Sequence, residues 1–338
     1  MIKKIVTLGE IMLRLSTPTG IRLSQTDQFS AHYGGAEANV AVSLAQFGYA
    51  VYFVTKVPDH PLGKAVEQHL KCHGVQTNYL LKGGERLGTY YLEAGAGERS
   101  AQVTYDRKNS SFSKLGVDEV KIEEILQGAS LFHVTGITLA LSPSLRELVL
   151  LILLKAKELG VKTSFDFNYR AKLWSQDEAS EAVKPLLPYI DICFCGELDA
   201  VHILGVHPAD GSLSQEERLI NYYQTIKEMY PNIQYLCSTF RTVISASSNK
   251  LQGNLYVGGK LHQSNVHTIE PIVDRVGGGD AFAAGILSGI LEEIPAEEMV
   301  SFAAAASALK HTIQGDCNIF SREEILDFAA KEPGKIVR

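Results

Sequence analysis

The chain alternates short, continuous apolar runs with helical stretches over most of its length. The apolar runs lie at residues 5–8, 51–57, 131–134, 161–167, 190–195 and 234–238. The helical stretches lie at residues 36–47, 63–73, 144–158, 177–186, 197–204, 215–229, 280–292, 296–311 and 322–330. Continuous apolar runs, rather than alternating ones, are typical of parallel strands covered on both faces. The pattern predicts an α/β fold of three layers, with a mostly parallel central sheet between two layers of helices.

Two segments interrupt this alternation. Residues 11–33 and 87–107 have an extended, alternating pattern, with glycine turns at Gly95 and Gly97 in the second. We expect them to form a small β-sheet lid, built from about 11–34 and 86–108, over the core of a single domain spanning 1–338. A lid of this kind excludes water from a site beneath it. Its open strand edges invite pairing with a second copy, which predicts a homodimer or higher oligomer through the lid.

Composition and missing motifs exclude several classes of protein. The net charge is -6, from 38 acidic and 32 basic residues, so neither nucleic acid nor an anionic membrane is an expected partner. The 5 cysteines form no framework spacing, and the amino terminus has no signal-peptide pattern, which favours a reduced cytoplasmic protein. The signatures of P-loop enzymes, zinc proteases, Rossmann dehydrogenases and α/β-hydrolases are absent from the sequence.

The strongest chemical motif is a glycine triplet followed by an aspartate and an apolar helix. Consecutive glycines at a helix start leave backbone N–H groups open to an anion. A carboxylate beside them suits acid–base work on a group that attacks the anion. The alternative is a plain helix start with an aspartate cap, for which one glycine is enough. The residues concerned are Gly277, Gly278, Gly279 and Asp280.

This motif, with Asp274 before it and Gly285 after it, resembles the carboxyl-terminal signature of the ribokinase-like (PfkB) carbohydrate kinases. The stretch 34–41 (GGAEANVA) resembles the glycine-pair substrate loop of the same family. The resemblance covers essentially the whole chain. It implies transfer of the ATP γ-phosphate to a sugar hydroxyl, with Asp280 as the base and the 277–279 amides as the anion hole.

Tyr91, the stretches 105–107 (YDR) and 166–170 (DFNYR), and the pair Leu173 and Trp174 after them resemble 2-keto-3-deoxygluconate kinases within that family. Arginine offers a planar fork to a carboxylate, which a neutral sugar does not need. Alternatively, Arg107 is a solvated lid charge, and Arg170 forms a structural ion pair or contacts the ATP phosphates. The resemblance implies phosphorylation at O6 and sugar contacts from Gly35, Tyr91, Tyr105, Arg107, Arg170, Asp280 and Asp316.

Fructokinases share part of this pattern, so a fructokinase or ribokinase acting on a neutral sugar stays open. A second alternative is a non-catalytic sugar-binding regulator on the same fold. The sequence does not separate gluco from galacto epimers, which differ in one hydroxyl.

Two nucleotide motifs depart from the family pattern. The magnesium-associated motif has become 196–199 (GELD), which leaves Asp199 as the expected ligand of Mg²⁺. The nucleotide loop has become 237–242 (CSTFRT) and has no glycine. The resemblance implies ATP contacts from Asn168, Arg170, Glu197, Ser238, Thr239, Arg241, Gly277 and Gly279. A monovalent cation near Asp274 is open, because Arg275 replaces the usual small or polar residue.

Overall fold

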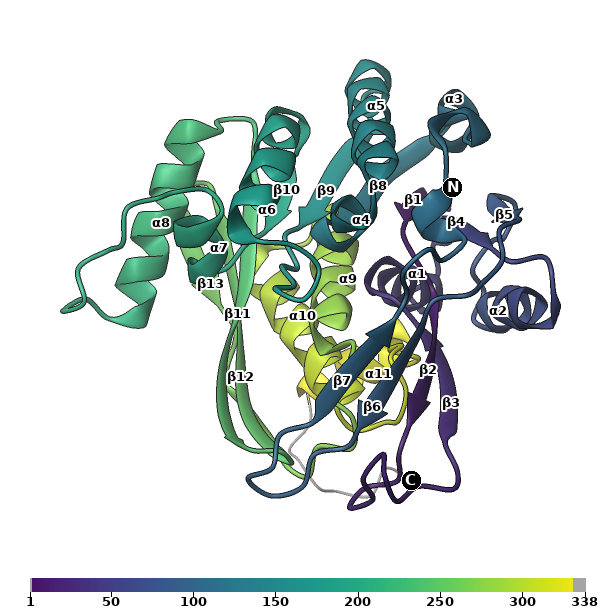
Figure 1. Cartoon of the computed structure of the whole chain (residues 1–338). Coiled ribbons are helices and arrows are strands. Elements are labelled where there is room, and N and C mark those ends of the chain that lie inside the picture. The colour runs from purple at the N-terminus through teal and green to yellow at the C-terminus, as the bar shows by residue number, and fades with distance from the viewer. Residues whose placement is uncertain (1, 331–338) are drawn as a thin grey trace.

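The computed structural model describes residues 2–330, and its largest element is a sheet of ten strands. These strands are β1 (Lys4–Leu8), β4 (Ala50–Val57), β5 (Leu80–Lys82), β8 (Ala129–Thr135), β9 (Lys162–Asp166), β10 (Ile192–Phe194), β11 (Tyr235–Ser245), β12 (Ser248–Val257), β13 (Lys260–Gln263) and β14 (His267–Ile269). Their order is β13-β12-β11-β10-β9-β8-β1-β4-β5, with β14 paired to β12 (Figure 1). The strands from β5 to β11 are parallel, and β12 pairs antiparallel with its neighbours.

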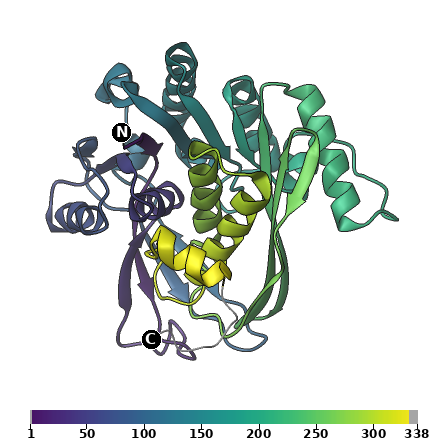
Figure 2. The same ribbon diagram turned by 180° about the vertical axis from the view of Figure 1, so that it is seen from behind.

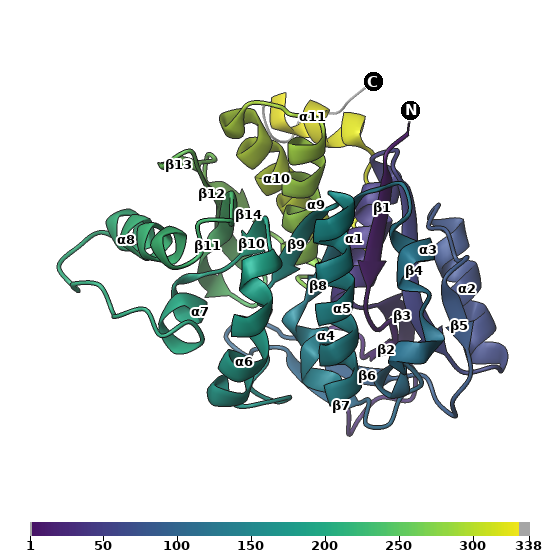
Figure 3. The same cartoon turned by 90° about the horizontal axis from the view of Figure 1, so that it is seen from above.

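Helices cover both faces of this sheet, as Figures 2 and 3 show. One layer contains α1 (Ala36–Gln46), α2 (Pro61–Cys72), α9 (Gly278–Leu291), α10 (Ala296–Lys310) and α11 (Arg322–Ala330). The other contains α3 (Ile122–Leu126), α4 (Gly136–Leu141), α5 (Pro143–Leu159), α6 (Gln176–Val183), α7 (Glu197–His202) and α8 (Gln215–Met229). Short 3₁₀ turns lie at Phe112–Lys114, Val117–Glu119 and Lys184–Tyr189.

Side chains of one strand alternate between two apolar cores. On β1, Ile5 packs with the α9 and α10 layer, whereas Val6 packs with the α5 layer, and both are fully buried. A strand buried on both faces has mostly apolar side chains, which is why residues 5–8 carry no charge and Thr7 is their one polar member. The predicted α/β fold with a mostly parallel sheet is confirmed. None of the helices within residues 2–330 is long and apolar enough to span a membrane.

A separate four-stranded sheet projects from the carboxyl-terminal edge of the parallel strands (Figure 1). Its strands are β2 (Met12–Ser16), β3 (Ser30–Gly34), β6 (Thr89–Glu93) and β7 (Gln102–Asp106), in the order β3-β2-β6-β7. All four fall within the two segments predicted for the small sheet. Because only a few residues join β1 to β2, this sheet is held close to the end of β1.

One large element differs from the expectation. The strand predicted to end at residue 238 continues to Ser245 as β11 and forms a long antiparallel hairpin with β12. Its outer half has only two apolar residues, Val243 and Ile244, and both are exposed, so no continuous apolar run marks it in the sequence. The extension matters for function, because it carries Thr239 and Arg241 toward the cavity described next.

Candidate active site

A cavity of about 610 Å³ lies at the carboxyl-terminal edge of the large sheet, beneath the small one. Glu10 follows β1 and Asp166 ends β9, while Gly35 and Gly277 cap the amino termini of α1 and α9. Tyr90 reaches the cavity from β6. Ligands of open α/β sheets bind at this edge, because loops and helix amino termini converge there.

The glycine triplet forms a tight turn into α9. Gly277 has φ 82°, and a Cβ at this position would lie 1.7 Å from the Asp316 carbonyl oxygen, so no side chain fits. The Gly278 carbonyl accepts a 2.7 Å hydrogen bond from Ser307 Oγ, which fixes the turn from below. The N–H groups of a first helical turn have no acceptor within the helix. At Gly278 and Gly279 they line the cavity and can bind an anion.

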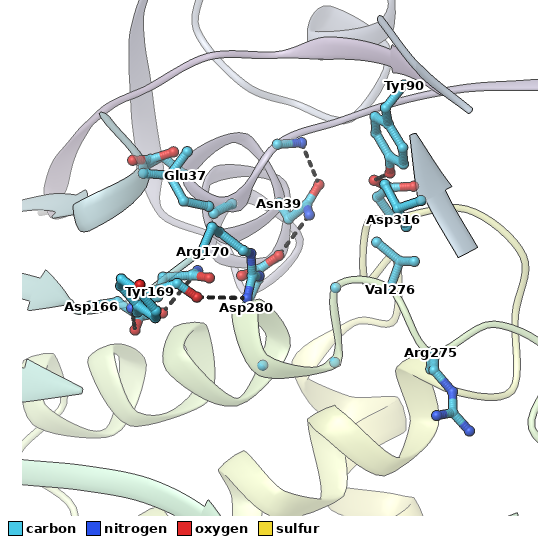
Figure 4. A pocket seen from close by; sticks show the side chains of 18 of the residues that line it. Glu37, Asn39, Tyr90, Asp166, Tyr169, Arg170, Arg275, Val276, Asp280 and Asp316 are labelled. Atoms are coloured by element: carbon cyan, nitrogen blue, oxygen red, sulfur yellow. Dashed lines mark hydrogen bonds between the residues drawn. The ribbon is translucent and has the colours of Figure 1, made fainter. Parts of the chain in front are cut away.

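Asp280 lies in the same turn, where α1 and α9 meet (Figure 4). Its Oδ2 accepts a 2.7 Å hydrogen bond from Asn39 Nδ2, and Asn39 Oδ1 accepts one of 3.3 Å from the Gly35 amide. Desolvation raises the pKa of Asp280 to about 6, although the Asn39 hydrogen bond and the Arg170 guanidinium oppose this shift. A carboxylate with this pKa is ionised at neutral pH and can accept a proton from a hydroxyl.

Two further carboxylates lie near Asp280. Burial raises the pKa of Asp166 to about 8, and the charges of Asp280 and Asp199 add to this effect. Burial also raises the pKa of Asp199 to about 6, and its Oδ2 accepts a 2.9 Å hydrogen bond from the Gly196 amide. Within residues 2–330, no three His, Cys, Asp or Glu side chains converge as a metal-binding group. Mg²⁺ commonly uses one or two carboxylates together with water and phosphate, so crowded negative charge here fits an ion that arrives with a nucleotide.

Three arginines bring positive charge to the cavity, and one of them, Arg170, lies beside Asp280 (Figure 4). Arg170 follows β9, Arg241 lies on β11, and Arg275 precedes α9. None of the three forms an ion pair with a carboxylate in the part of the chain that is described. Burial lowers the pKa of Arg241, and repulsion from Arg275 and Arg170 lowers it further. Arg170 acts on the nearby carboxylates, since its charge opposes the rise that burial causes in the pKa of Asp280 and of Asp199, while Arg275 donates to the backbone carbonyl oxygens of Ser245 and Ala246. Three guanidinium groups gathered in one cavity suit a polyanion such as a triphosphate.

A fourth arginine, Arg107, enters the cavity just beyond β7. It is only 6% exposed, which rules out the alternative of a solvated lid charge. Its Nε donates to Glu10 Oε2 at 2.8 Å, and its Nη2 donates to the same oxygen. Its Nη1 has no hydrogen-bond partner within residues 2–330. Arg107 is therefore oriented by a buried ion pair and still has a donor edge for a ligand.

The structure corrects one predicted sugar contact on the small sheet. Tyr90 pairs with Tyr105 across β6 and β7 and lines the cavity. The next residue, Tyr91, faces the other side of the sheet, where its ring lies 6.0 Å from that of Phe29. Because strand side chains alternate, the predicted contact at Tyr91 is wrong by one residue, and Tyr90 occupies that place.

Asp316 lines the cavity with both carboxylate oxygens already occupied. Its Oδ1 accepts a 2.8 Å hydrogen bond from Arg14 Nη1, and its Oδ2 accepts one from the Tyr90 hydroxyl (Figure 4). Arg14 also donates to Asp274 Oδ2 at 2.6 Å. Asp316 is thus the anchor between the small sheet and the turn before α9.

Two predicted nucleotide contacts lie outside the cavity lining. Glu197, on α7, pairs with Arg218 on α8, with 3.4 Å between Oε1 and Nε. Ser238 precedes Thr239 on β11, and its Oγ accepts a hydrogen bond from Asn254 Nδ2. Adjacent strand residues face opposite sides, so Thr239 and Ser238 cannot both reach one cavity. The predicted residues that do line it are Gly35, Tyr105, Arg107, Asn168, Arg170, Asp199, Thr239, Arg241, Gly277, Gly278, Gly279, Asp280 and Asp316.

Several cavity residues escaped the sequence prediction, namely Glu10, Glu37, Asn39, Tyr90, Asp166, Arg275 and His311. Asn39 had a usable signal, because it lies four residues after Gly35 and so shares its side of α1. Glu37 accepts three hydrogen bonds through Oε1, from the Thr135 amide and hydroxyl and from the Thr138 hydroxyl. These hydrogen bonds join residues about 100 positions apart, and contacts between such distant residues leave no pattern in the sequence.

Comparison with known proteins agrees with this geometry. Residues 2–322 match the model of the pfkB family carbohydrate kinases. A 2-dehydro-3-deoxygalactonokinase of Haloferax volcanii is 33% identical over 325 residues, covering 96% of each chain. The crystal structure of 2-dehydro-3-deoxygluconokinase from Thermotoga maritima is 42% identical, with a TM-score of 0.94, over 97% of this chain and 100% of that one.

A PfkB family carbohydrate kinase of Listeria grayi is 46% identical, with a TM-score of 0.93, over 97% of this chain and 100% of that one. These similarities remove the alternative of a non-catalytic regulator. The family match, the fold and the named relatives agree: this chain is a sugar kinase and belongs to the PfkB family of carbohydrate kinases.

Proposed function

We propose that this kinase transfers the γ-phosphate of ATP to the O6 hydroxyl of 2-keto-3-deoxygluconate. The main support is the unpaired Nη1 edge of Arg107, held in the cavity by Glu10. A buried guanidinium with a free edge suits a substrate carboxylate, because hydrogen bonds to an ionised acceptor are stronger than those to the hydroxyl or carbonyl oxygens of a neutral sugar. The names of the Haloferax and Thermotoga relatives point to the same class of sugar acid.

The chain's own residues divide the chemistry among them. Asp280 takes the proton of the attacking hydroxyl, and Asn39 holds that carboxylate in place. The amides of residues 277–279 bind the γ-phosphoryl oxygens as negative charge shifts during transfer. The polyphosphate lies along Arg170, Arg241 and Arg275, with Asn168 and Thr239 nearby.

The sugar acid lies under the small sheet, against Gly35, Tyr90, Tyr105 and Arg107. Asp166 and Asp199 would hold Mg²⁺, which supplies positive charge to the phosphates when bound.

A substrate panel distinguishes this proposal from a fructokinase or ribokinase. Purified protein with ATP and Mg²⁺ is offered 2-keto-3-deoxygluconate, its galacto epimer, 5-keto-2-deoxygluconate, fructose and ribose, and ADP release is measured. We expect the largest kcat/KM for a 2-keto-3-deoxy acid, because Arg107 binds its carboxylate. A larger kcat/KM for fructose or ribose would contradict the proposal. The epimer pair then decides between gluco and galacto substrates.

The glycine triplet offers a matched pair of variants that tests the anion hole. A Cβ at Gly279 meets no atom within 4 Å, so Gly279→Ala is expected to leave Tm nearly unchanged. Its methyl group enters the cavity beside the amides, so kcat is expected to fall by about 10²-fold, as when one oxyanion donor is lost.

Gly277→Ala is the counterpart, because its Cβ overlaps Asp316 and its φ is left-handed. This variant should lose stability as well as activity. Gly278 is a poorer probe, since its Cβ would lie 2.4 Å from His311 Cε1. Full activity of Gly279→Ala would argue against an anion hole at this turn.

The oligomer through the small sheet also stays a proposal. The face of that sheet turned away from the cavity carries Tyr91 and the 40% exposed Phe29. A second copy pairing there would cover apolar surface and a strand edge together.

A further inference from the structure

One lysine is buried beside the anion-binding turn. Lys310 ends α10 and is 0% exposed, which is rare for this residue type unless its charge has partners. Its Nζ donates to the backbone carbonyl oxygens of Asp274, at 3.3 Å, and Ile313, at 3.4 Å. No carboxylate forms an ion pair with it within residues 2–330. The ammonium group is therefore held by carbonyl oxygens, as a small cation would be.

The surroundings keep this buried charge tolerable. Burial lowers the pKa of Lys310, while the carboxylates of Asp274 and Asp316 oppose that shift and Arg14 adds to it. The carboxylates of Asp274 and Asp316 and the cations of Arg14 and Lys310 together have zero formal charge. Lys310 also lies in the last turn of α10, where the carboxyl end of the helix favours a cation. Removing the ammonium would leave an unbalanced negative charge and two poorly satisfied carbonyl groups.

The two carbonyl groups belong to different loops. Asp274 begins the turn that leads through Gly277 into α9, and Ile313 begins the loop that leads to Asp316. These loops touch, because the Gly315 amide donates to Asp274 Oδ2 at 3.1 Å and Gly277 abuts the Asp316 backbone. Whatever joins them sets the position of the 277–279 amides.

We infer that the Lys310 ammonium is a built-in cation that clamps the loop before α9 to the loop after α10 and so positions the anion hole. The motifs of the sequence leave a monovalent cation near Asp274 open. With Lys310 in place, the protein carries that positive charge itself and needs no added ion. Lys310 is a positioning residue and does not touch the substrates. The inference rests on the anion-hole role proposed above, whereas the ion binding tested below can be measured without it.

The test compares a variant that leaves space with one that fills it. Lys310→Ala opens a carbonyl-lined space of the kind that K⁺ or NH₄⁺ occupies, whereas Lys310→Met fills it with an uncharged chain. Without K⁺ or NH₄⁺, both variants should lose about tenfold or more in kcat, because small misplacement of catalytic groups is costly. The KM values should change little. Added KCl or NH₄Cl should restore kcat and raise Tm for Lys310→Ala, while Lys310→Met stays impaired.

The controls separate a specific ion from salt and from a generic lysine effect. Choline chloride at equal ionic strength should restore nothing. Lys227 is a matched residue distant from the cavity, since its Nζ also donates to two carbonyl groups after a helix, those of Pro231 and Ile233. Lys227→Ala should show kcat independent of K⁺.

Three results would overturn the inference. The first is wild-type activity that requires K⁺ at constant ionic strength, a measurement that needs no variant to fold. The second is equal response of Lys310→Ala and Lys310→Met to K⁺. The third is a K⁺-dependent Tm without recovery of kcat, which would leave an ion site but no positioning role. Failure of the sugar-acid proposal would appear separately, as wild-type preference for a neutral sugar.

Discussion

Replacing Asp280 with asparagine is expected to abolish most phosphoryl transfer while making the protein more stable. Asparagine keeps the shape and can still accept the hydrogen bond from Asn39, but it cannot take a proton from the sugar hydroxyl. Loss of a general base typically costs 10²–10⁴-fold, so we expect kcat to fall by about 10³-fold. The KM values for ATP and sugar should change much less.

The stability gain follows from the pKa of Asp280, which desolvation raises to about 6. A raised carboxyl pKa means that the native state disfavours the ionised form, so ionisation destabilises the wild type at neutral pH. The neutral variant should gain on the order of 1–2 kcal/mol, allowing for water at the open cavity. The gain should be present in full at pH 7–8, shrink as the pH falls below about 6, and be gone at about pH 4, where the aspartate of the unfolded chain is protonated as well.

Steady-state kinetics and thermal unfolding across pH test both parts. In the wild type, kcat/KM should fall as the pH drops through about 6, because the base form of Asp280 is lost. Asn39→Ala is the control, since it removes the hydrogen bond but leaves the base, and it should raise the pH at which activity falls. An Asp280→Asn variant with kcat near that of the wild type would refute the base assignment.

Replacing Arg107 with methionine is expected to weaken both the fold and the binding of the sugar acid. Arg107 and Glu10 are 6% and 3% exposed, and the variant leaves the Glu10 carboxylate buried without its counter-charge. Breaking one side of a buried ion pair costs about 3–5 kcal/mol. Loss of hydrogen bonds to a charged group adds a 10- to 100-fold rise in KM for the acid, equivalent to about 1.5–3 kcal/mol.

A double variant separates these two effects. Glu10→Gln combined with Arg107→Met removes both charges, so most of the lost stability should return in denaturant unfolding. The KM for 2-keto-3-deoxygluconate should stay high, while any weak activity on fructose should be unaffected. If the double variant regains the wild-type KM for the acid, Arg107 acts only through stability and the carboxylate contact is wrong.

Much of the fold could be predicted because its causes are local. The apolar run at residues 5–8 requires burial on both faces of the sheet. In β1, Ile5 packs into the core on one face and Val6 into the core on the other. The glycine triplet at 277–279 requires a turn without side chains, and Gly277 meets the Asp316 backbone there. The outer half of β11 was missed because its two apolar residues, Val243 and Ile244, are too few to form a run and lie exposed.

The site was predicted less completely, and its errors share one cause. The prediction named Tyr91, whereas its neighbour Tyr90 lines the cavity. Adjacent strand residues lie on opposite faces of the sheet, so an error of one residue moves the side chain to the wrong face. Glu197 and Ser238 were expected in the cavity but contact Arg218 and Asn254 instead. Each depends on which way a side chain points once the elements are packed.

The layers, the two glycine turns and the aspartate beside the second turn can all be read from the order of the residues. These depend on hydrophobic pattern and backbone freedom, which neighbouring residues carry. Which charged groups meet depends on the packing of distant segments. Arg107 pairs with Glu10 across 97 positions, Arg14 with Asp316 across 302, and Lys310 reaches the Asp274 carbonyl across 36. A charge acts through the groups within a few ångströms of it, and folding alone brings those groups together.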